Sequence, residues 1–238
     1  LAVMTRDCAP VLVLAEGPAL ADALRAAWPD ACPIALFADV FAADPIEGPP
    51  RALAPTDAVT IIYTSGTSGE PKGVVLHRAN VDYMLPQTLT SLRKITPEGR
   101  PDKVFHFLPF CFAGSRIMLW TQLYRGNPLM LSMDLQNLVQ EMGTADPHYY
   151  LNVPAVLERI KNGVGKKIEE RGGIALSLYR RGQDAFRKAR RGEAGLVDRL
   201  ALALAKKLVF SKIKQQVGPS LEFLICGSAA LAEETQWW

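Results

Sequence analysis

Short apolar runs alternate with segments of helical periodicity along most of the chain. The apolar runs that predict buried strands are residues 11–14, 33–37, 59–63, 74–76, 104–108, 129–131, 149–153 and 221–226. The segments that predict helices are residues 19–28, 80–95, 115–125, 134–142 and 154–217. Breaks are expected at Gly172-Gly173 and Gly192, and a bend or interruption at Pro86.

This alternation indicates an α/β fold with mostly parallel sheets flanked by helices. Sheets of this kind bind ligands at the carboxyl ends of their strands. Two expected strands run directly into small, polar residues, one after Tyr63 and the other after Cys226. These two junctions are therefore the first candidates for a binding site.

The segment after the strand at 59–63 has the composition of a phosphate-binding loop. It consists of Tyr63, Thr64, Ser65, Gly66, Thr67, Ser68, Gly69, Glu70, Pro71, Lys72 and Gly73. Glycines let backbone N–H groups approach an anion, hydroxyl groups add donors, and Lys72 supplies a positive charge. It is not a Walker A loop, because Lys72 precedes its glycine and no Ser or Thr follows.

The eleven-residue string resembles the phosphate-loop signature of the adenylate-forming superfamily, which includes acyl-CoA synthetases, peptide-synthetase adenylation domains and luciferases. Residues 107–110 stand where this family has its Leu-Pro motif, and residues 152–158 are similar to its Val-Pro segment. Residues 159–217 resemble the basic helical insertion of long-chain fatty acyl-CoA synthetases, and residues 224–231 resemble the approach to a second glycine-rich motif.

The resemblance spans most of residues 1–238 and identifies the chain as an internal piece of the large N-terminal AMP-binding domain. The phosphate loop would be residues 63–73, the basic helical insertion would be residues 154–217, and the C-terminal lid domain would lie outside the chain. The implied reaction is ATP-dependent activation of a long-chain fatty acid to an acyl-adenylate, followed by thioester formation with CoA. AMP and pyrophosphate are the products released.

The resemblance also implies roles for individual residues. Lys72 would be catalytic, and the phosphates would be bound by Thr64, Ser65, Gly66, Thr67, Ser68, Gly69 and Lys72. The nucleotide and acyl pocket would be lined by Gly227, Ser228, Ala229, Phe110 and Phe112, although the two phenylalanines equally fit core packing. Mg²⁺ would enter with ATP, its glutamate motif lying outside the chain. No metal-ligating residues are expected within the chain.

Several departures from the family pattern affect these expectations. Cys111 to Gly114 stand where many long-chain members have a His, and Ser228 to Ala230 replace the commoner Gly-Ala-Pro. The chain also stops before the family's Tyr-Gly-x-Thr-Glu motif, ribose-binding Asp, hinge and lid lysine. We therefore expect the 238-residue chain to be inactive by itself.

Positive charge is concentrated in one block. Residues 159–214 hold sixteen Lys or Arg and five Asp or Glu, whereas the remainder holds eleven and nineteen. Such a block is either a solvated helical surface or a contact for an anionic membrane. Nucleic acid is not expected as a partner, because the block offers only Tyr179, Phe186 and Phe210 for base stacking.

The remaining features point to the cytoplasm, with a possible peripheral position at the inner membrane surface. No apolar run approaches the ~18 residues that span a bilayer, and the four cysteines form no CxxC pair. The expected partners are ATP, a long-chain fatty acid and CoA. Two alternatives remain: a fatty acyl-AMP ligase that passes the acyl group to a carrier protein, and an inactive, truncated phosphate-binding copy.

Each of the three histidines has a structural interpretation as well as a functional one. His77 follows the phosphate loop after one short strand and would either contact substrate or cap the next helix. His106 and His148 are expected to be structural, because each lies in or beside an apolar strand.

Overall fold

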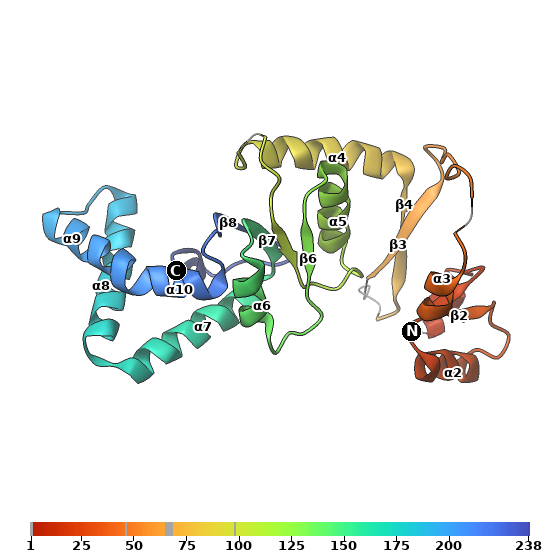
Figure 1. Ribbon diagram of the computed structural model, residues 1–238, viewed down its shortest axis with the longest axis horizontal. Helices are drawn as coiled ribbons and strands as arrows, with labels where there is room; N and C mark the ends of the chain where they lie inside the picture. The colour runs from red at the N-terminus through yellow and green to blue at the C-terminus, as the bar shows by residue number, and fades with distance from the viewer. Residues whose placement is uncertain (1, 46, 65–68, 98) are drawn as a thin grey trace. The chain divides into compact units, whose positions relative to one another are not determined.

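The computed structural model describes residues 2–45, 47–64, 69–97 and 99–238. The chain forms two compact units, residues 1–87 and residues 88–238. Figure 1 labels the helices and strands of both. Each unit is described by itself.

The first unit contains two small sheets. A parallel pair joins β1 (Val13–Ala15) to β2 (Ile34–Leu36), and an antiparallel hairpin joins β3 (Ala58–Thr64) to β4 (Lys72–His77). Its helices are α1 (Ala2–Asp7), α2 (Pro18–Ala27), α3 (Phe37–Ala42) and the first part of α4 (Arg78–Arg93). Helix α2 starts with proline at its first position, where no hydrogen bond is lost, and buries Ala21 and Leu24.

The second unit is built on a four-stranded parallel sheet with the order β6-β5-β7-β8. These strands are β5 (Val104–His106), β6 (Leu129–Leu131), β7 (Tyr149–Asn152) and β8 (Phe223–Cys226). In the register of β7 and β8, Tyr149 pairs with Phe223 and Asn152 pairs with Cys226. All four strands therefore end at one edge of the sheet.

Helices cover both faces of this sheet. On one face, Leu92 of α4 and Met118 of α5 (Ala113–Arg125) pack against Val104 and Tyr149. On the other face, Leu138 and Met142 of α6 (Leu138–Ala145) pack against Phe105 and Tyr150. Neighbouring residues of one strand thus contribute to opposite cores, as the two-residue period of a strand requires.

The basic block forms a helical arm (Figure 1). Its elements are α7 (Pro154–Arg171), α8 (Gly173–Arg191), α9 (Leu196–Ala205), the π-helical turn η1 (Lys206–Phe210) and α10 (Ser211–Val217). The chain leaves α7 at Gly172 (φ +60°) and α8 at Gly192 (φ +78°), both in conformations that favour glycine. Helix α11 (Glu233–Gln236) follows β8.

The predicted α/β class with a parallel sheet and flanking helices is confirmed. The expected breaks at Gly172-Gly173 and Gly192 are also confirmed. Helix α4 runs through Pro86 without interruption, because packing of Leu89 and Leu92 outweighs the lost backbone donor. Within the described ranges, no helix has both the length and the apolar character needed to cross a bilayer.

Candidate functional site

The predicted phosphate loop lies in the hairpin of the first unit. Thr64 at the end of β3 pairs with Lys72 at the start of β4, so the hairpin holds these two residues opposite each other. Four of the expected phosphate ligands, Ser65, Gly66, Thr67 and Ser68, lie outside the described residues. Gly69 is described and has a φ of +82°, a conformation in which an L side chain would be strained.

The base of the hairpin is held by close packing around Gly73. A Cβ atom at Gly73 would lie 2.9 Å from Ile61 Cγ2 and 3.1 Å from Tyr63 Cζ, so glycine is needed for these side chains to cross the strand pair. The Tyr63 hydroxyl donates to Asp7 Oδ2 at 2.7 Å, and this bond raises the pKa of Tyr63 well above its usual range. The strand that precedes the loop is thereby tied to α1.

The two basic residues of β4 have different surroundings. Lys72 is exposed and has no ion-pair partner within 4.0 Å among the described residues, so its ammonium group is available to an anion. His77, in contrast, lies with Nδ1 2.8 Å from the carbonyl oxygen of Thr56. Its backbone N–H donates to Asn80 Oδ1 at 2.8 Å, so the start of α4 is capped by Asn80.

In the second unit, His106 ends β5 with its ring buried. Neither ring nitrogen has a hydrogen-bond partner among the described residues. Burial lowers the pKa of His106, and a weaker interaction with the backbone of Leu108, which does not meet hydrogen-bond geometry, opposes this shift, so the neutral ring is favoured. The ring stacks on Phe110 with centroids 5.0 Å apart. The structure therefore brings Phe110, a predicted pocket residue, against an unpaired histidine.

Asn152 ends the neighbouring strand β7 and is also fully buried. Its Oδ1 accepts the backbone N–H of Val153 at 2.8 Å, but Nδ2 has no partner among the described residues. An unpaired buried amide costs free energy unless another molecule supplies the acceptor. Asn152 is therefore a candidate ligand contact.

The glycine-rich segment after β8 lies beside Asn152. The backbone N–H of Gly227 donates to the carbonyl oxygen of Asn152 at 3.2 Å. Apart from its chain neighbours, no described residue has an atom within 4 Å of a Cβ placed on Gly227, so the space above it is open to the described part of the chain. Ser228 has a φ of +72°, a strained conformation for serine, and Ala229 is exposed. Three predicted pocket residues thus follow directly from the strand end.

Phe112, the other predicted pocket phenylalanine, is the N-cap residue of α5 and is exposed. Its backbone N–H donates to the carbonyl oxygen of Pro109 at 3.2 Å, which closes a turn. The same turn is held by Arg116, whose Nε donates to the carbonyl oxygen of Phe110 at 2.6 Å. Neither Phe110 nor Phe112 is part of the packed cores, and both side chains are partly exposed.

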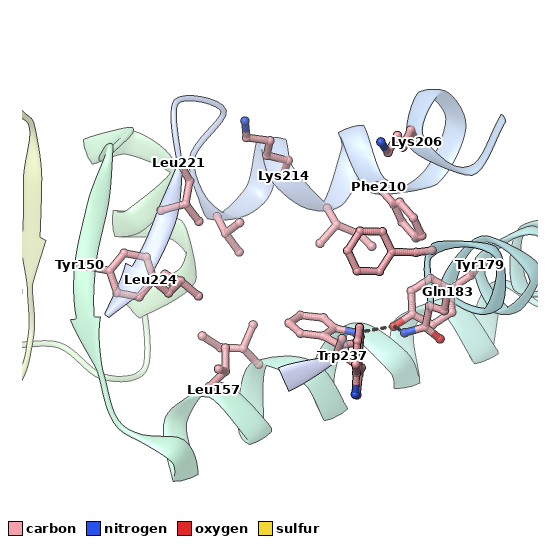
Figure 2. A pocket seen from close by; sticks show the side chains of 15 residues that line it. Tyr150, Leu157, Tyr179, Gln183, Lys206, Phe210, Lys214, Leu221, Leu224 and Trp237 are labelled. Carbon is pink, nitrogen blue, oxygen red and sulfur yellow. Dashed lines mark hydrogen bonds between the residues drawn. The ribbon is translucent and has the colours of Figure 1, made fainter. Parts of the chain in front are cut away.

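An apolar cavity of about 320 Å³ opens between the sheet and the helical arm (Figure 2). Its walls come from β7, β8, α7, α8, η1, α10 and the last two residues of the chain. The lining residues are Tyr150, Leu157, Ile160, Tyr179, Gln183, Phe186, Lys206, Phe210, Ile213, Lys214, Val217, Leu221, Leu224, Trp237 and Trp238. The only charged groups in this lining are the two lysines, which Figure 2 shows at the margin.

The cavity lies on the same sheet face as Asn152. Residues two apart in a strand point to one face, so Tyr150 shares its face with Asn152, and Leu224 shares its face with Cys226. Two residues of a strand span roughly 6.6 Å. Burial raises the pKa of Tyr150 to about 12, in keeping with an apolar environment. The cavity therefore begins about one side chain below the carboxyl edge of the sheet.

The far end of the cavity is closed by a small polar group. Trp238 Nε1 donates to the Tyr179 hydroxyl at 2.5 Å, and Gln183 Nε2 donates to the same oxygen at 3.1 Å. Figure 2 shows Tyr179 and Gln183 together at the α8 end of the cavity. The polar atoms of this wall are thus bonded to one another.

Among the described residues, no group of three or more His, Cys, Asp or Glu side chains is arranged to hold a metal ion. The oxygen ligands that Mg²⁺ prefers are available on nucleotide phosphates.

The sheet, with its ligand-accessible carboxyl edge, and the glycine-rich hairpin are those of an adenylate-forming enzyme. The chain belongs to the AMP-binding enzyme family, whose model matches residues 1–238.

Among relatives, long chain acyl-CoA synthetase 3 of Arabidopsis thaliana is 30% identical over 180 residues, covering 74% of this chain and 27% of that protein. Fatty acyl-CoA synthetase B of Dictyostelium discoideum is 27% identical over 183 residues, covering 76% of this chain and 26% of that protein. The chain thus spans about a quarter of the length of the curated relatives it matches.

Solved structures with low sequence identity share the fold. The adenylation domain of a carboxylate reductase from Mycobacterium chelonae superposes with a TM-score of 0.66 at 19% identity, covering 98% of this chain and 38% of that one. The N-terminal domain of FACL13 from Mycobacterium tuberculosis gives a TM-score of 0.61 at 17% identity, covering 98% and 48%.

Sequence reasoning did not identify three features of the candidate site. His106 was expected to be structural, and this stays a prediction; the position of its unpaired ring at the carboxyl edge of the sheet was not foreseen. Asn152 appeared only as part of a motif, although a polar residue at the end of an apolar strand was a usable signal. The cavity could not be predicted, because its walls come from segments up to 88 residues apart.

Proposed function

We propose that the full-length protein to which this chain belongs is a long-chain fatty acid–CoA ligase. It activates the fatty acid with ATP to an acyl-adenylate and then forms the CoA thioester. In the first step, a carboxylate oxygen attacks the α-phosphorus and pyrophosphate leaves. In the second step, the CoA thiolate attacks the acyl carbonyl carbon and AMP leaves. The proposal includes cytoplasmic action with peripheral membrane contact, and no nucleic-acid partner.

The apolar cavity supports a long aliphatic substrate. Its volume of about 320 Å³ lies within the ~300–1,000 Å³ of small-molecule sites. Aliphatic and aromatic side chains form nearly all of its lining, and burial of an acyl chain there would gain about 0.8 kcal/mol for each methylene group. The acyl chain of the substrate would enter at the carboxyl edge near Asn152 and run past Tyr150 and Leu224.

The phosphate loop supplies the electrostatic part of the proposal. A carboxylate is already nucleophilic, so the first step needs positioning and stabilisation of phosphoryl charge more than a general base. Lys72 would neutralise charge on the pyrophosphate, and the backbone around Gly69 would donate N–H groups. Thr64, Ser65, Gly66, Thr67 and Ser68 would complete the phosphate contacts. Gly227, Ser228 and Ala229 would line the nucleotide, with Phe110 and Phe112 at the acyl entrance.

The first test changes the phosphate loop in the full-length protein. Lys72→Ala should lower pyrophosphate release from ATP and hexadecanoate by about 10²-fold, as expected for loss of a transition-state contact. Lys94→Ala is the matched control, since Lys94 is an exposed lysine outside the proposed site. Equal rates for Lys72→Ala and Lys94→Ala would remove Lys72 from the site.

The second test fills the cavity. Ile160→Trp replaces an aliphatic side chain in the wall contributed by α7 with a larger indole ring. Turnover with hexadecanoate should fall at least about tenfold, while turnover with butanoate should stay near wild type, because only the longer chain needs the lost volume. Equal losses for both acids would show that the acyl chain lies elsewhere.

The products formed by the full-length protein show whether CoA or a carrier protein accepts the acyl group. A CoA ligase releases acyl-CoA when CoA is added to the full-length protein with ATP and hexadecanoate. Accumulation of acyl-adenylate without acyl-CoA would instead indicate transfer to a carrier protein. Absence of both products, with ATP still bound, would indicate an inactive phosphate-binding copy.

A further inference from the structure

The outer side of α9 carries an exposed apolar stripe. It is formed by side chains four residues apart, Leu196, Leu200, Leu204 and Leu208, with Val197 beside them. Leu196 is 84% exposed, Val197 81% and Leu200 63%. Residues four apart lie on one side of a helix, so these side chains form one continuous surface.

The inner side of the same helix is fixed against α8. Ala205 is fully buried, and a Cβ placed on Gly182 of α8 would lie only 2.3 Å from the Ala205 Cβ. Such close packing leaves no room for another rotational setting of α9. Asp198 also ties the start of α9 to α8. Its Oδ1 accepts a hydrogen bond from Lys188 Nζ at 3.2 Å, and its Oδ2 accepts one from the Gly195 N–H at 3.1 Å. The leucine stripe is therefore held outward.

Positive charge surrounds the stripe. Arg199 lies three residues after Leu196, and Lys207 lies three residues after Leu204, so both flank the stripe on the same helical side. Arg190 and Arg191 end α8 just before α9 begins. Residues 187–214 contain nine Lys or Arg and two Asp or Glu. An exposed apolar stripe with a cationic border is the pattern of a helix that lies in a lipid–water interface.

We propose that α9 and the end of α8 form a docking surface for an anionic phospholipid bilayer, with the leucine stripe inserted among acyl chains and the arginines and lysines at the headgroups. A second copy of the chain fits less well, because pairing two stripes would bring both cationic borders together. The proposal rests on the peripheral membrane contact included in the proposed function and assigns it to a surface, and its test measures vesicle binding rather than ligase turnover, so the two can fail separately.

Vesicle sedimentation with the full-length protein tests this surface. Phosphatidylcholine vesicles are compared with vesicles that also contain phosphatidylglycerol. Binding should rise with the anionic lipid and fall as salt increases. The double variant Leu196→Ser, Leu200→Ser should reduce binding to anionic vesicles at least about tenfold, since burial of one leucine alone changes partition by roughly that factor.

Matched variants distinguish binding through this surface from nonspecific binding through exposed apolar or charged residues elsewhere. Leu123→Ser with Met133→Ser removes two exposed apolar residues outside the arm and should leave binding unchanged. Arg190→Gln with Arg191→Gln should weaken binding and its salt dependence, whereas Arg93→Gln with Lys94→Gln should not. All replaced side chains are exposed, and melting curves verify that each variant is folded.

Four results would overturn the proposal. The first is equal binding to neutral and anionic vesicles, and the second is binding to neither. The third is wild-type binding by the stripe variant. The fourth is a concentration-dependent dimer in sedimentation velocity that the stripe variant abolishes, since the stripe would then be an interface between copies of the chain.

Discussion

The amino and carboxyl edges of the parallel sheet in the second unit differ in how far their buried polar side chains are hydrogen-bonded. At the amino edge, Asp102 is fully buried and fully paired. Its two carboxylate oxygens lie 2.6 Å from Arg125 Nη2 and 3.1 Å from Arg100 Nη2. Its backbone N–H donates to Asn127 Oδ1 at 3.0 Å. The carboxylate and the backbone N–H of this residue are thus bonded within the chain.

Neighbouring groups extend the same pattern of pairing. Arg100 also reaches Glu222 before β8 at 2.7 Å. Asp146 accepts from Lys103 Nζ at 2.7 Å and from the backbone N–H of Ser220 at 2.6 Å. These bonds join segments that are far apart in the sequence, so the amino edge contributes to the stability of the unit.

At the carboxyl edge, His106 and Asn152 are buried with polar atoms that no described residue satisfies. A protein that only needed a stable sheet would gain by placing apolar groups there. Unpaired buried atoms also occur elsewhere, for example Nε of Arg100 at the amino edge, but three of them lie at these two adjacent strand ends. The ligand contacts proposed above would therefore lie at the opposite end of the strands from the paired carboxylates.

The largest expected effect comes from breaking the paired edge. Asp102→Ala leaves Arg125 partly buried without its carboxylate and should lower the free energy of unfolding by about 3–5 kcal/mol. Chemical denaturation of the protein measures this loss. Glu169→Gln is the control, because its ion pair with Arg180 is exposed and long at 3.7 Å, and it should cost no more than about 1 kcal/mol. Similar losses for both variants would contradict the special role of the amino edge.

The division into strands and helices was largely predictable, because it depends on local periodicity. The apolar run at 149–153 became β7, and the glycines at 172 and 192 ended helices, as their backbone freedom predicts. The phosphate-loop string also placed Thr64 and Lys72 in one turn, and the structure has them paired across a hairpin. Whether these residues bind phosphate stays a prediction.

What could not be predicted depends on contacts between distant segments. Nothing local in the sequence pairs Asp102 with Arg125, and the antiparallel pairing of β3 with β4 differs from the parallel main sheet. Asn152 illustrates the limit most clearly. Its polarity was visible in the sequence, but its unpaired Nδ2 depends on which groups the fold brings near it.

A change at the unpaired edge should separate binding from stability. Asn152→Leu removes the hydrogen bond to Val153 but also removes the unpaired amide, so the two effects nearly cancel. The free energy of unfolding should change by no more than about 1 kcal/mol. Acyl-adenylate formation by the full-length protein should fall about tenfold or more. A stability loss as large as that of Asp102→Ala would show that Asn152 is structural.

Acid should weaken the paired edge first. The pKa of Asp146 is lowered to about 2, chiefly by Lys103 and then by Ser220. A carboxylate with a lowered folded pKa stabilises the protein above its unfolded value near 3.8, and this contribution is lost as pH falls from about 4 to 2. Melting temperatures measured across that range should fall more steeply in the wild type than in Asp146→Asn. Parallel curves would contradict the assignment.

The smallest expected effect belongs to His106 at the unpaired edge. Because burial lowers its folded pKa, the unfolded chain takes up the proton more readily as pH falls below about 6.5, and stability is lost there. His106→Leu should keep the stability seen at pH 7.5 but lose part of the decline between pH 7 and 5.5, measured by denaturation at each pH. Asn152→Leu is the control, since it removes the other unpaired group without a titrating ring and should retain the decline. If the decline is the same in all three proteins, the His106 ring is already paired in solution, and the contrast between the two edges then rests on Asn152.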